Sequence, residues 1–98
     1  MRRVLFTEAA RIDFTDAIKW YDAEAPEIAD RFQNAIDEIV QRIEDNPRQF
    51  APSSYNTRRA IVRRFPYLLI FREQSDACYV VAVFHMRRNP TIWQKRVL

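Results

Sequence analysis

The segment PEIADRFQNAIDEIVQRIEDNP, residues 26–47, has the clearest periodicity in the chain and decides the fold. Its apolar side chains recur every three or four residues, which is the spacing of a single helix face. They are Ala29, Phe32, Ile36, Ile39, Val40 and Ile43. Proline is tolerated in a first helical turn, and the Asn46-Pro47 pair interrupts helical structure. We therefore expect one amphipathic helix between the two prolines, with an apolar face that must pack on another element.

A second helix is expected just before this one. Apolar side chains between residues 9 and 21 cover a wide arc, so this helix can contact a sheet on one side and a helix on the other. Thr7 can cap its first turn, and Glu8 suits the positive end of the helix dipole. A short turn joins the two helices, which predicts an αα-hairpin preceded by a strand at residues 2–6.

Three strand-like runs follow a polar loop at residues 48–57. They cover residues 58–64, 67–71 and 78–84. The last two runs are almost wholly apolar, as interior strands are, and a basic tail covers residues 86–98. The order of elements is then β-α-α-β-β-β. We expect a single α+β domain over residues 1–98, with the helical hairpin packed on one face of a small, mainly antiparallel sheet.

The composition argues against several classes of protein. The chain has no glycine, so phosphate-cradling loops and dinucleotide motifs are not expected. One histidine and one cysteine cannot form a structural zinc site of the usual kind, so we expect no metal and no cofactor. The single Cys78 cannot form an internal disulfide, and neither a signal peptide nor a membrane-spanning run is visible. We therefore expect a cytoplasmic protein that does not associate with membranes.

Charge is divided unequally along the chain, although the net charge is only +3. Residues 1–50 hold seven Lys/Arg and eleven Asp/Glu, a net charge of −4. Residues 51–98 hold nine Lys/Arg and two Asp/Glu, a net charge of +7. The basic half favours an acidic partner, either nucleic acid or an acidic protein segment. The alternative interpretation is a basic face that only contacts water.

Arginine pairs flank the first of the three strand-like runs, at Arg58-Arg59 and at Arg63-Arg64. Because side chains alternate along a strand, Arg59 and Arg63 are predicted to share one face. Two arginines on one face can bind a phosphate or a carboxylate. Charged side chains also protect an edge strand from aggregation, which is the alternative interpretation.

The segment from His85 to Trp93 carries the other candidate residues. His85 follows the last apolar run and precedes Arg87 and Arg88. If the protein cleaves RNA without a metal, histidine is the residue type suited to moving the 2′-hydroxyl proton near neutral pH, and the arginines could stabilise the charged phosphorane. A structural hydrogen bond is the alternative role for His85. Trp93 can stack on a base, or it can anchor the tail by packing on the core.

Several stretches of the chain together resemble the ParE/RelE toxin superfamily. They are Trp20-Tyr21, the amphipathic helix ending at Asn46-Pro47, the run Arg63-Arg64-Phe65-Pro66-Tyr67, and Ala82-Val83-Phe84-His85 followed by Arg87-Arg88-Asn89-Pro90 and Trp93. The resemblance covers essentially the whole chain in the same order of elements. It implies a toxin of a type II toxin–antitoxin system, paired with a cognate antitoxin in a possible hetero-oligomer. The antitoxin is expected to lay an acidic-to-apolar segment across the toxin.

Two activities occur within this superfamily. ParE-like members poison DNA gyrase by binding it, whereas RelE-like members cut messenger RNA on the ribosome with a set of basic residues and an acid/base side chain. The hairpin and the Arg-Arg-Phe-Pro-Tyr run are more similar to the ParE and plasmid-stabilisation branch. The central-strand lysines and C-terminal tyrosine of the RelE pattern are missing, since the only lysines are Lys19 and Lys95 and no tyrosine follows Tyr79.

The resemblance therefore predicts a gyrase-directed, ParE-like binding toxin. Its expected contact residues for the target or the antitoxin are Arg59, Arg63, Arg64, Arg87, Arg88 and Trp93. The alternative is a metal-independent ribonuclease of the RelE kind, in which His85, Arg63 and Arg87 resemble the site of histidine-using members and the partners are the ribosome and mRNA. A third possibility is a binding module on the same fold that has lost toxicity.

Overall fold

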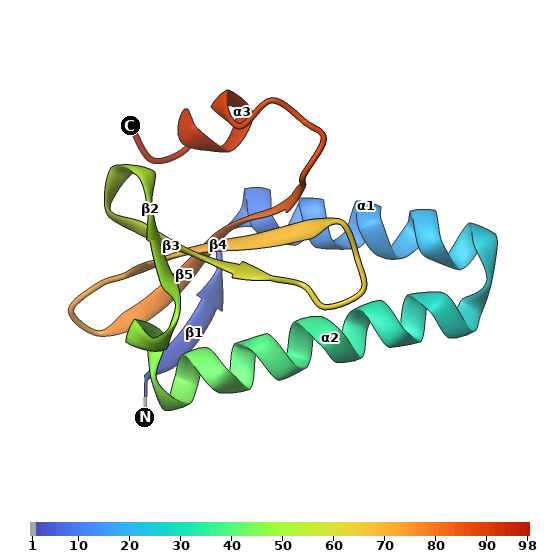
Figure 1. The fold of residues 1–98 in the computed structure, drawn as a ribbon, viewed down its shortest axis with the longest axis horizontal. Helices are drawn as coiled ribbons and strands as arrows, with labels where there is room; N and C mark the ends of the chain where they lie inside the picture. The colour runs from blue at the N-terminus through green and yellow to red at the C-terminus, as the bar shows by residue number, and fades with distance from the viewer. Residues whose placement is uncertain (1) are drawn as a thin grey trace.

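The computed structural model describes residues 2–98 of the chain. Its strands and long helices follow the predicted order, with a short strand, a short helix and two 3-10 helices added (Figure 1). The bounds are β1 Arg3–Phe6, α1 Glu8–Glu24, α2 Pro26–Asp45, β2 Ala51–Ser53, β3 Thr57–Ile61, β4 Tyr67–Glu73, β5 Ala77–His85 and α3 Thr91–Gln94. Short 3-10 helices lie on either side of β2, at Pro47–Gln49 and Ser54–Asn56. The predicted α+β class is confirmed.

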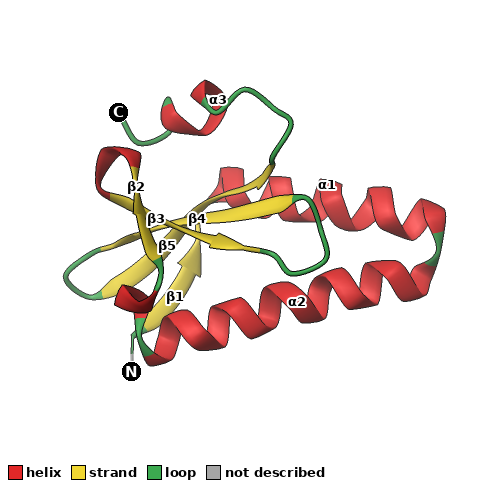
Figure 2. Ribbon diagram, in the orientation of Figure 1, coloured by secondary structure: helices red, strands yellow, loops and turns green. Residues whose placement is uncertain are grey.

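The helical hairpin begins and ends where the sequence places it. The Thr7 hydroxyl accepts a hydrogen bond from the Ala10 backbone N–H at 3.2 Å and so caps α1. Pro26 opens α2, and Asn46 ends it in an extended conformation. The two helices run side by side and cover one face of the sheet (Figure 2). Among the helices that the structure describes, none combines the length and apolar character needed to cross a membrane.

The five strands form a mixed sheet in the order β1-β5-β4-β3-β2. Only β1 runs parallel to its neighbour β5, and the other three pairs are antiparallel. The apolar strands β4 and β5 occupy interior positions, as predicted. One core lies between the sheet and the hairpin, and a second, smaller cluster lies on the opposite face beneath α3. Consequently both faces of β4 and β5 are covered at least in part.

The first strand after the hairpin is shorter than expected. The sequence predicts a strand over residues 58–64, but β3 ends at Ile61. Arg63 and Arg64 lie in the turn that leads to β4. Backbone hydrogen bonds from Val62 N–H to the Tyr67 carbonyl, at 3.0 Å, and from Phe65 N–H to the Val62 carbonyl, at 3.1 Å, close this turn. Arg59 and Arg63 therefore do not share a strand face.

The polar loop at residues 48–57 also contains a strand that sequence reasoning missed. The three residues of β2 pair with β3 at the edge of the sheet, in the register Ala51↔Arg59, Pro52↔Arg58 and Ser53↔Thr57. Proline and serine indicate a loop in sequence, yet an edge strand tolerates proline because one side of it needs no partner. The basic tail, similarly, contains the short helix α3.

Candidate functional site

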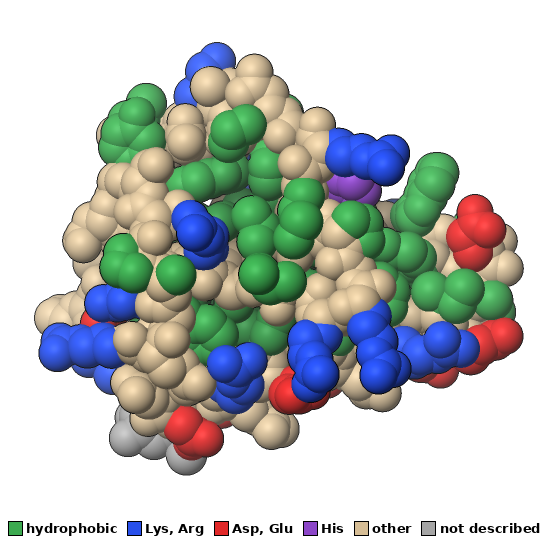
Figure 3. Space-filling view, viewed as in Figure 1, with side chains coloured by type: hydrophobic (Ala, Val, Ile, Leu, Met, Phe, Trp, Pro, Cys, Tyr) green, Lys and Arg blue, Asp and Glu red, His purple; other side chains and the backbone are tan. Residues whose placement is uncertain are grey.

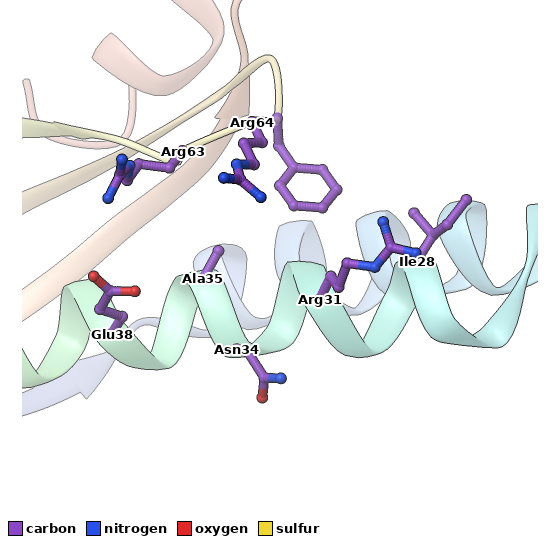
Figure 4. A pocket seen from close by; sticks show the side chains of 8 residues that line it. Ile28, Arg31, Asn34, Ala35, Glu38, Arg63 and Arg64 are labelled. Atoms are coloured by element: carbon purple, nitrogen blue, oxygen red, sulfur yellow. The ribbon is translucent and has the colours of Figure 1, made fainter.

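A basic groove separates α2 from the turn between β3 and β4. It has a volume of about 450 Å³, and Figure 4 shows the side chains that line it. Arg63 and Arg64 come from the turn, whereas Arg31 comes from α2. The apolar lining consists of Ile28, Ala35 and Phe65, and the remaining polar lining consists of Asn34 and Glu38. Three guanidinium groups thus surround a small apolar surface, which we call the arginine groove.

The three arginines of the groove form no ion pair within residues 2–98, and Glu38 offsets only one of their charges. Residues 2–98 contain three ion pairs, Arg2–Glu73, Arg48–Glu73 and Arg96–Asp13, and none of them involves Arg31, Arg63 or Arg64. Figure 3 shows Lys and Arg side chains gathered along the boundary between the sheet and α2. A cluster of like charges that lacks internal partners favours binding of an anionic group.

His85 lies in a separate, smaller hollow of about 180 Å³ next to α1. Its ring packs edge-on against Tyr67, with 5.1 Å between ring centroids. Nδ1 of His85 accepts a hydrogen bond from the Arg87 backbone N–H at 3.1 Å, and the His85 carbonyl accepts one from Arg88 N–H at 3.0 Å. These hydrogen bonds stabilise the turn after β5. They leave Nε2 as the ring nitrogen of His85 that can make other contacts.

The same hollow has acidic and aromatic walls. Asp13, Asp16 and Trp20 of α1 line it, together with Arg88. Burial raises the pKa of Tyr67, a rise that Arg88 opposes and Asp13 reinforces, so the phenol stays protonated near neutral pH. Arg96 neutralises the Asp13 carboxylate, so Asp16 is the charge in this hollow that would repel a phosphodiester.

A third pocket of about 250 Å³ opens on the face of the sheet away from the hairpin. Arg59 and Arg88 line it beside Trp93 of α3. Trp93 is only 4% exposed and packs with Ile70 and Phe84 in the second core cluster. This burial supports the interpretation of Trp93 as the anchor of the tail, because a ring that stacks on a base needs an open face.

Comparison with known proteins places this geometry in a family. Residues 4–90 match the family model described as the ParE toxin of type II toxin–antitoxin system, parDE. The chain belongs to this family. It is 31% identical over 90 residues to Toxin ParE2 of two strains of Mycobacterium tuberculosis, CDC 1551 / Oshkosh and H37Rv, an alignment that covers 91% of this chain and 86% of each relative. The resemblance to the ParE/RelE superfamily is therefore confirmed on its ParE side.

A solved structure supports the fold independently. One chain of the chromosomal ParDE TA system from P. aeruginosa superposes with a TM-score of 0.77 at 21% identity, covering 89% of this chain and 98% of that chain. At this level of identity the likeness concerns the fold alone. The helical hairpin on a mixed sheet is thus the architecture of a known ParDE component.

The three residues of the predicted ribonuclease site do not line one common cavity, although the Arg87 backbone N–H bonds to the His85 ring. Arg63 lines the arginine groove, His85 lines the hollow beside α1, and Arg87 lines neither of these two cavities. The other expected contact residues are also divided, with Arg64 in the groove and Arg59 in the pocket under α3. Of the six predicted contact residues, only Arg63 with Arg64, and Arg88 with Arg59 and Trp93, are brought together.

Sequence reasoning missed two contributors. Arg31 completes the arginine groove, and its signal is the spacing of Ile28, Arg31 and Ala35, which places all three on one side of α2. Asp13 is the other: its carboxylate binds Arg96 through two contacts of 2.6 and 3.1 Å. No local pattern predicts that pair, because the two residues lie 83 positions apart.

The Asp13–Arg96 pair also covers an edge of the sheet. The pairing of β1 with β5 ends at Val80, so beyond this residue β5 has no strand neighbour on that side within residues 2–98. Asp13 accepts the Val83 backbone N–H at 3.1 Å, and Arg96 donates to the Val81 carbonyl at 2.9 Å. The pair thereby satisfies backbone groups of an otherwise open edge and fastens the tail to α1.

Proposed function

We propose that this chain is a ParE-like toxin that acts by binding DNA gyrase and is neutralised by a cognate antitoxin in a toxin–antitoxin hetero-oligomer. Its expected place of action is the cytoplasm. Family membership supports the toxin assignment. The observation that carries the choice of a binding mechanism is that Arg63 and His85 line different cavities and Arg87 lines neither of them. A ribonuclease would need these groups around one phosphate.

One observation favours the ribonuclease as a second candidate. His85 and Arg88 line the same hollow, and Nε2 of His85 is not used by the hydrogen bond that holds Nδ1. A histidine next to an arginine can in principle move a proton beside a phosphate. Asp16 in the same hollow opposes this use, because Arg96 neutralises only Asp13, so the gyrase-directed toxin remains the preferred function. A binding module that has lost toxicity is the third candidate.

Pulse-labelling of DNA and protein synthesis, directly after induction of this chain alone, separates the three candidates. The gyrase-directed toxin predicts that DNA synthesis falls first, together with a DNA-damage response. The ribonuclease predicts that protein synthesis falls first, whereas a binding module leaves both unchanged. His85→Ala serves as the diagnostic variant, since the proposed mechanism expects it to remain toxic, whereas Arg87 is itself an expected contact for the target. Loss of toxicity in His85→Ala, with the fold and antitoxin binding retained, would instead favour the ribonuclease.

The target can be examined directly with purified components. The toxin should inhibit supercoiling by purified gyrase at concentrations that leave a single-stranded RNA substrate intact. Addition of the small protein that is encoded by the adjacent reading frame and co-purifies with the toxin should relieve the inhibition of gyrase. If no such protein binds the toxin, the proposed antitoxin partnership is wrong even where gyrase inhibition holds.

A further inference from the structure

The pocket under α3 collects positive charge without a matching negative charge. Arg59 and Arg88 line it, and no Asp or Glu of residues 2–98 lines it with them. Neither arginine takes part in the three ion pairs within the same residues. The guanidinium carbon of Arg88 lies 5.9 Å from the ring centroid of Phe84, which also lines the pocket. Two cations therefore border one cavity without a carboxylate, which favours an anionic occupant.

The rest of the lining is mainly apolar. The strand register pairs Arg59 with Ile70 and Leu68 with Phe84, so these four side chains lie on one face of the sheet. The apolar lining that follows β5 consists of Met86, Pro90 and Trp93. Figure 3 shows hydrophobic side chains gathered over the sheet below α3. The occupant that fits this lining has an apolar body in addition to its anionic group.

The tail that forms one wall of the pocket is fastened at several points. Trp93 packs into the second core cluster. The Asp13–Arg96 pair binds the tail to α1, and the Arg72 guanidinium donates a hydrogen bond to the Val97 carbonyl at 3.4 Å. The wall is thus in place before anything binds, and a preformed site loses less conformational entropy on binding.

The volume of the pocket, about 250 Å³, limits the size of the occupant. A water molecule takes about 30 Å³ of the liquid and bonded atoms pack more closely, so the pocket holds about ten non-hydrogen atoms. A nucleotide or a peptide segment is larger than this. Phe84 and Trp93 are each 4% exposed, so neither ring offers an open face on which a base could stack. The size and the covered rings therefore favour a small molecule over nucleic acid.

We propose that the pocket under α3 binds a small carboxylic acid with an aromatic or branched aliphatic body. The carboxylate binds Arg59 and Arg88, which are both exposed at the mouth of the pocket, and the body packs against Leu68 and Met86. This site goes beyond the proposed function and does not depend on it. Because the acid contacts both the sheet and the tail, its binding stabilises the folded toxin.

The test uses the full-length toxin with phenylacetate as the probe. The chain has two tryptophans, so Trp20→Phe leaves Trp93, in the wall of the pocket, as the only one. We expect phenylacetate to change the fluorescence of this variant in a saturable way, with a Kd below about 1 mM. Phenylacetamide has the same body without the charge, and acetate has the charge without the body. Each should bind at least about tenfold more weakly than phenylacetate.

Substitutions at exposed positions of the pocket separate its two halves. In the same background, Arg59→Gln and Arg88→Gln should each weaken phenylacetate binding about fivefold or more. Met86→Gln should weaken it about threefold, because a polar amide replaces an apolar group at a side chain that is 45% exposed. Arg63→Gln is the matched control, since it removes the same charge from the arginine groove and should change binding less than about twofold.

Thermal denaturation of the wild type provides a second measurement that does not depend on fluorescence. Phenylacetate at ten times its Kd should raise the Tm by about 5–10 °C. The rise should disappear in the double variant Arg59→Gln/Arg88→Gln, and it should persist in Arg63→Gln.

Several outcomes would overturn the inference. The site is wrong if phenylacetate changes neither signal up to about 10 mM, or if Arg63→Gln weakens binding as much as Arg59→Gln does. Equally tight binding of inorganic phosphate would reduce the pocket to a site for any small anion. Tighter binding of a single-stranded RNA oligomer, lost in Arg59→Gln and Arg88→Gln, would assign the pocket to nucleic acid. Inhibition of gyrase tests the proposed function separately, so either conclusion can fail while the other stands.

Discussion

Removal of the Asp13 carboxylate should destabilise the toxin more than a surface mutation does. The side chains of Asp13 and Arg96 are 11% and 23% exposed, so water reaches neither of them freely. In Asp13→Ala the Val83 N–H loses its acceptor, which costs about 1–3 kcal/mol. Arg96 loses a bidentate partner, and its partial exposure reduces that cost well below the 3–5 kcal/mol of a fully buried pair. We expect a total of about 3 kcal/mol.

Chemical and thermal denaturation followed by circular dichroism measure this loss. For a domain of this size, about 3 kcal/mol corresponds to a fall in Tm of about 12–24 °C. Asp13→Asn is the matched control, because its amide oxygen can still accept the Val83 N–H while the charge is removed. It should lose about half as much stability, on the order of 1–2 kcal/mol.

A double-mutant cycle with Arg96→Ala isolates the pair itself. Residues in direct contact are expected to show a coupling energy of about 1 kcal/mol or more, because the first mutation has already abolished the interaction that the second would remove. The reasoning is refuted if Asp13→Ala changes the free energy of unfolding by less than about 0.5 kcal/mol, the range of ordinary surface substitutions. Additive single effects would equally show that Asp13 and Arg96 act separately.

Three further predictions concern residues outside this pair. Trp93→Ala should lower the free energy of unfolding by about 3–5 kcal/mol, because it empties a core position. Trp20→Phe should leave the free energy of unfolding nearly unchanged, because the Trp20 side chain is 66% exposed. Urea denaturation measures both effects. Acrylamide should quench the fluorescence of Trp20 much more strongly than that of Trp93, and equal quenching would contradict the burial of Trp93. Burial raises the pKa of Cys78 and of Tyr67, so both side chains favour the neutral form in the folded state. Their contribution to the free energy of unfolding is complete below about pH 8.5 and is lost as the pH rises through the folded-state pKa values. Cys78→Ala should reduce this loss of stability when denaturation is measured from about pH 7 to 11.

The sequence predicted the elements well where local chemistry decides them. Thr7 and Pro26 mark the starts of α1 and α2 through capping and through the fixed φ of proline. The apolar runs that became β4 and β5 could only be interior strands, and the structure places them there. These predictions succeeded because the signal and the structure lie within a few residues of each other.

The candidate site was harder to predict, because non-local packing decides it. Arg59 and Arg63 look like neighbours on one strand, but the chain must turn after Ile61 to bury Val62, and the turn separates them. Arg31 comes from a helix that reads as a simple amphipathic element, and nothing local shows that the β3–β4 turn will lie over it. The position of an arginine relative to a turn 32 residues later depends on the packing of α2 against the sheet.

The net charges of the two halves of the sequence predict the sign of a partner's charge. Only the fold determines which charged side chains remain available to that partner. Arg96 belongs to the basic half, yet Asp13 neutralises it. Arg31 belongs to the acidic half, yet it joins Arg63 and Arg64 in a cluster whose arginines form none of the ion pairs within residues 2–98. Like charges held together repel each other, so removing one of the three should stabilise the free toxin slightly while it weakens the complex. If these arginines had a structural role, their removal would lower both the stability of the toxin and its affinity for the partner. A gain in stability with a loss of affinity therefore distinguishes a binding site from a structural cluster.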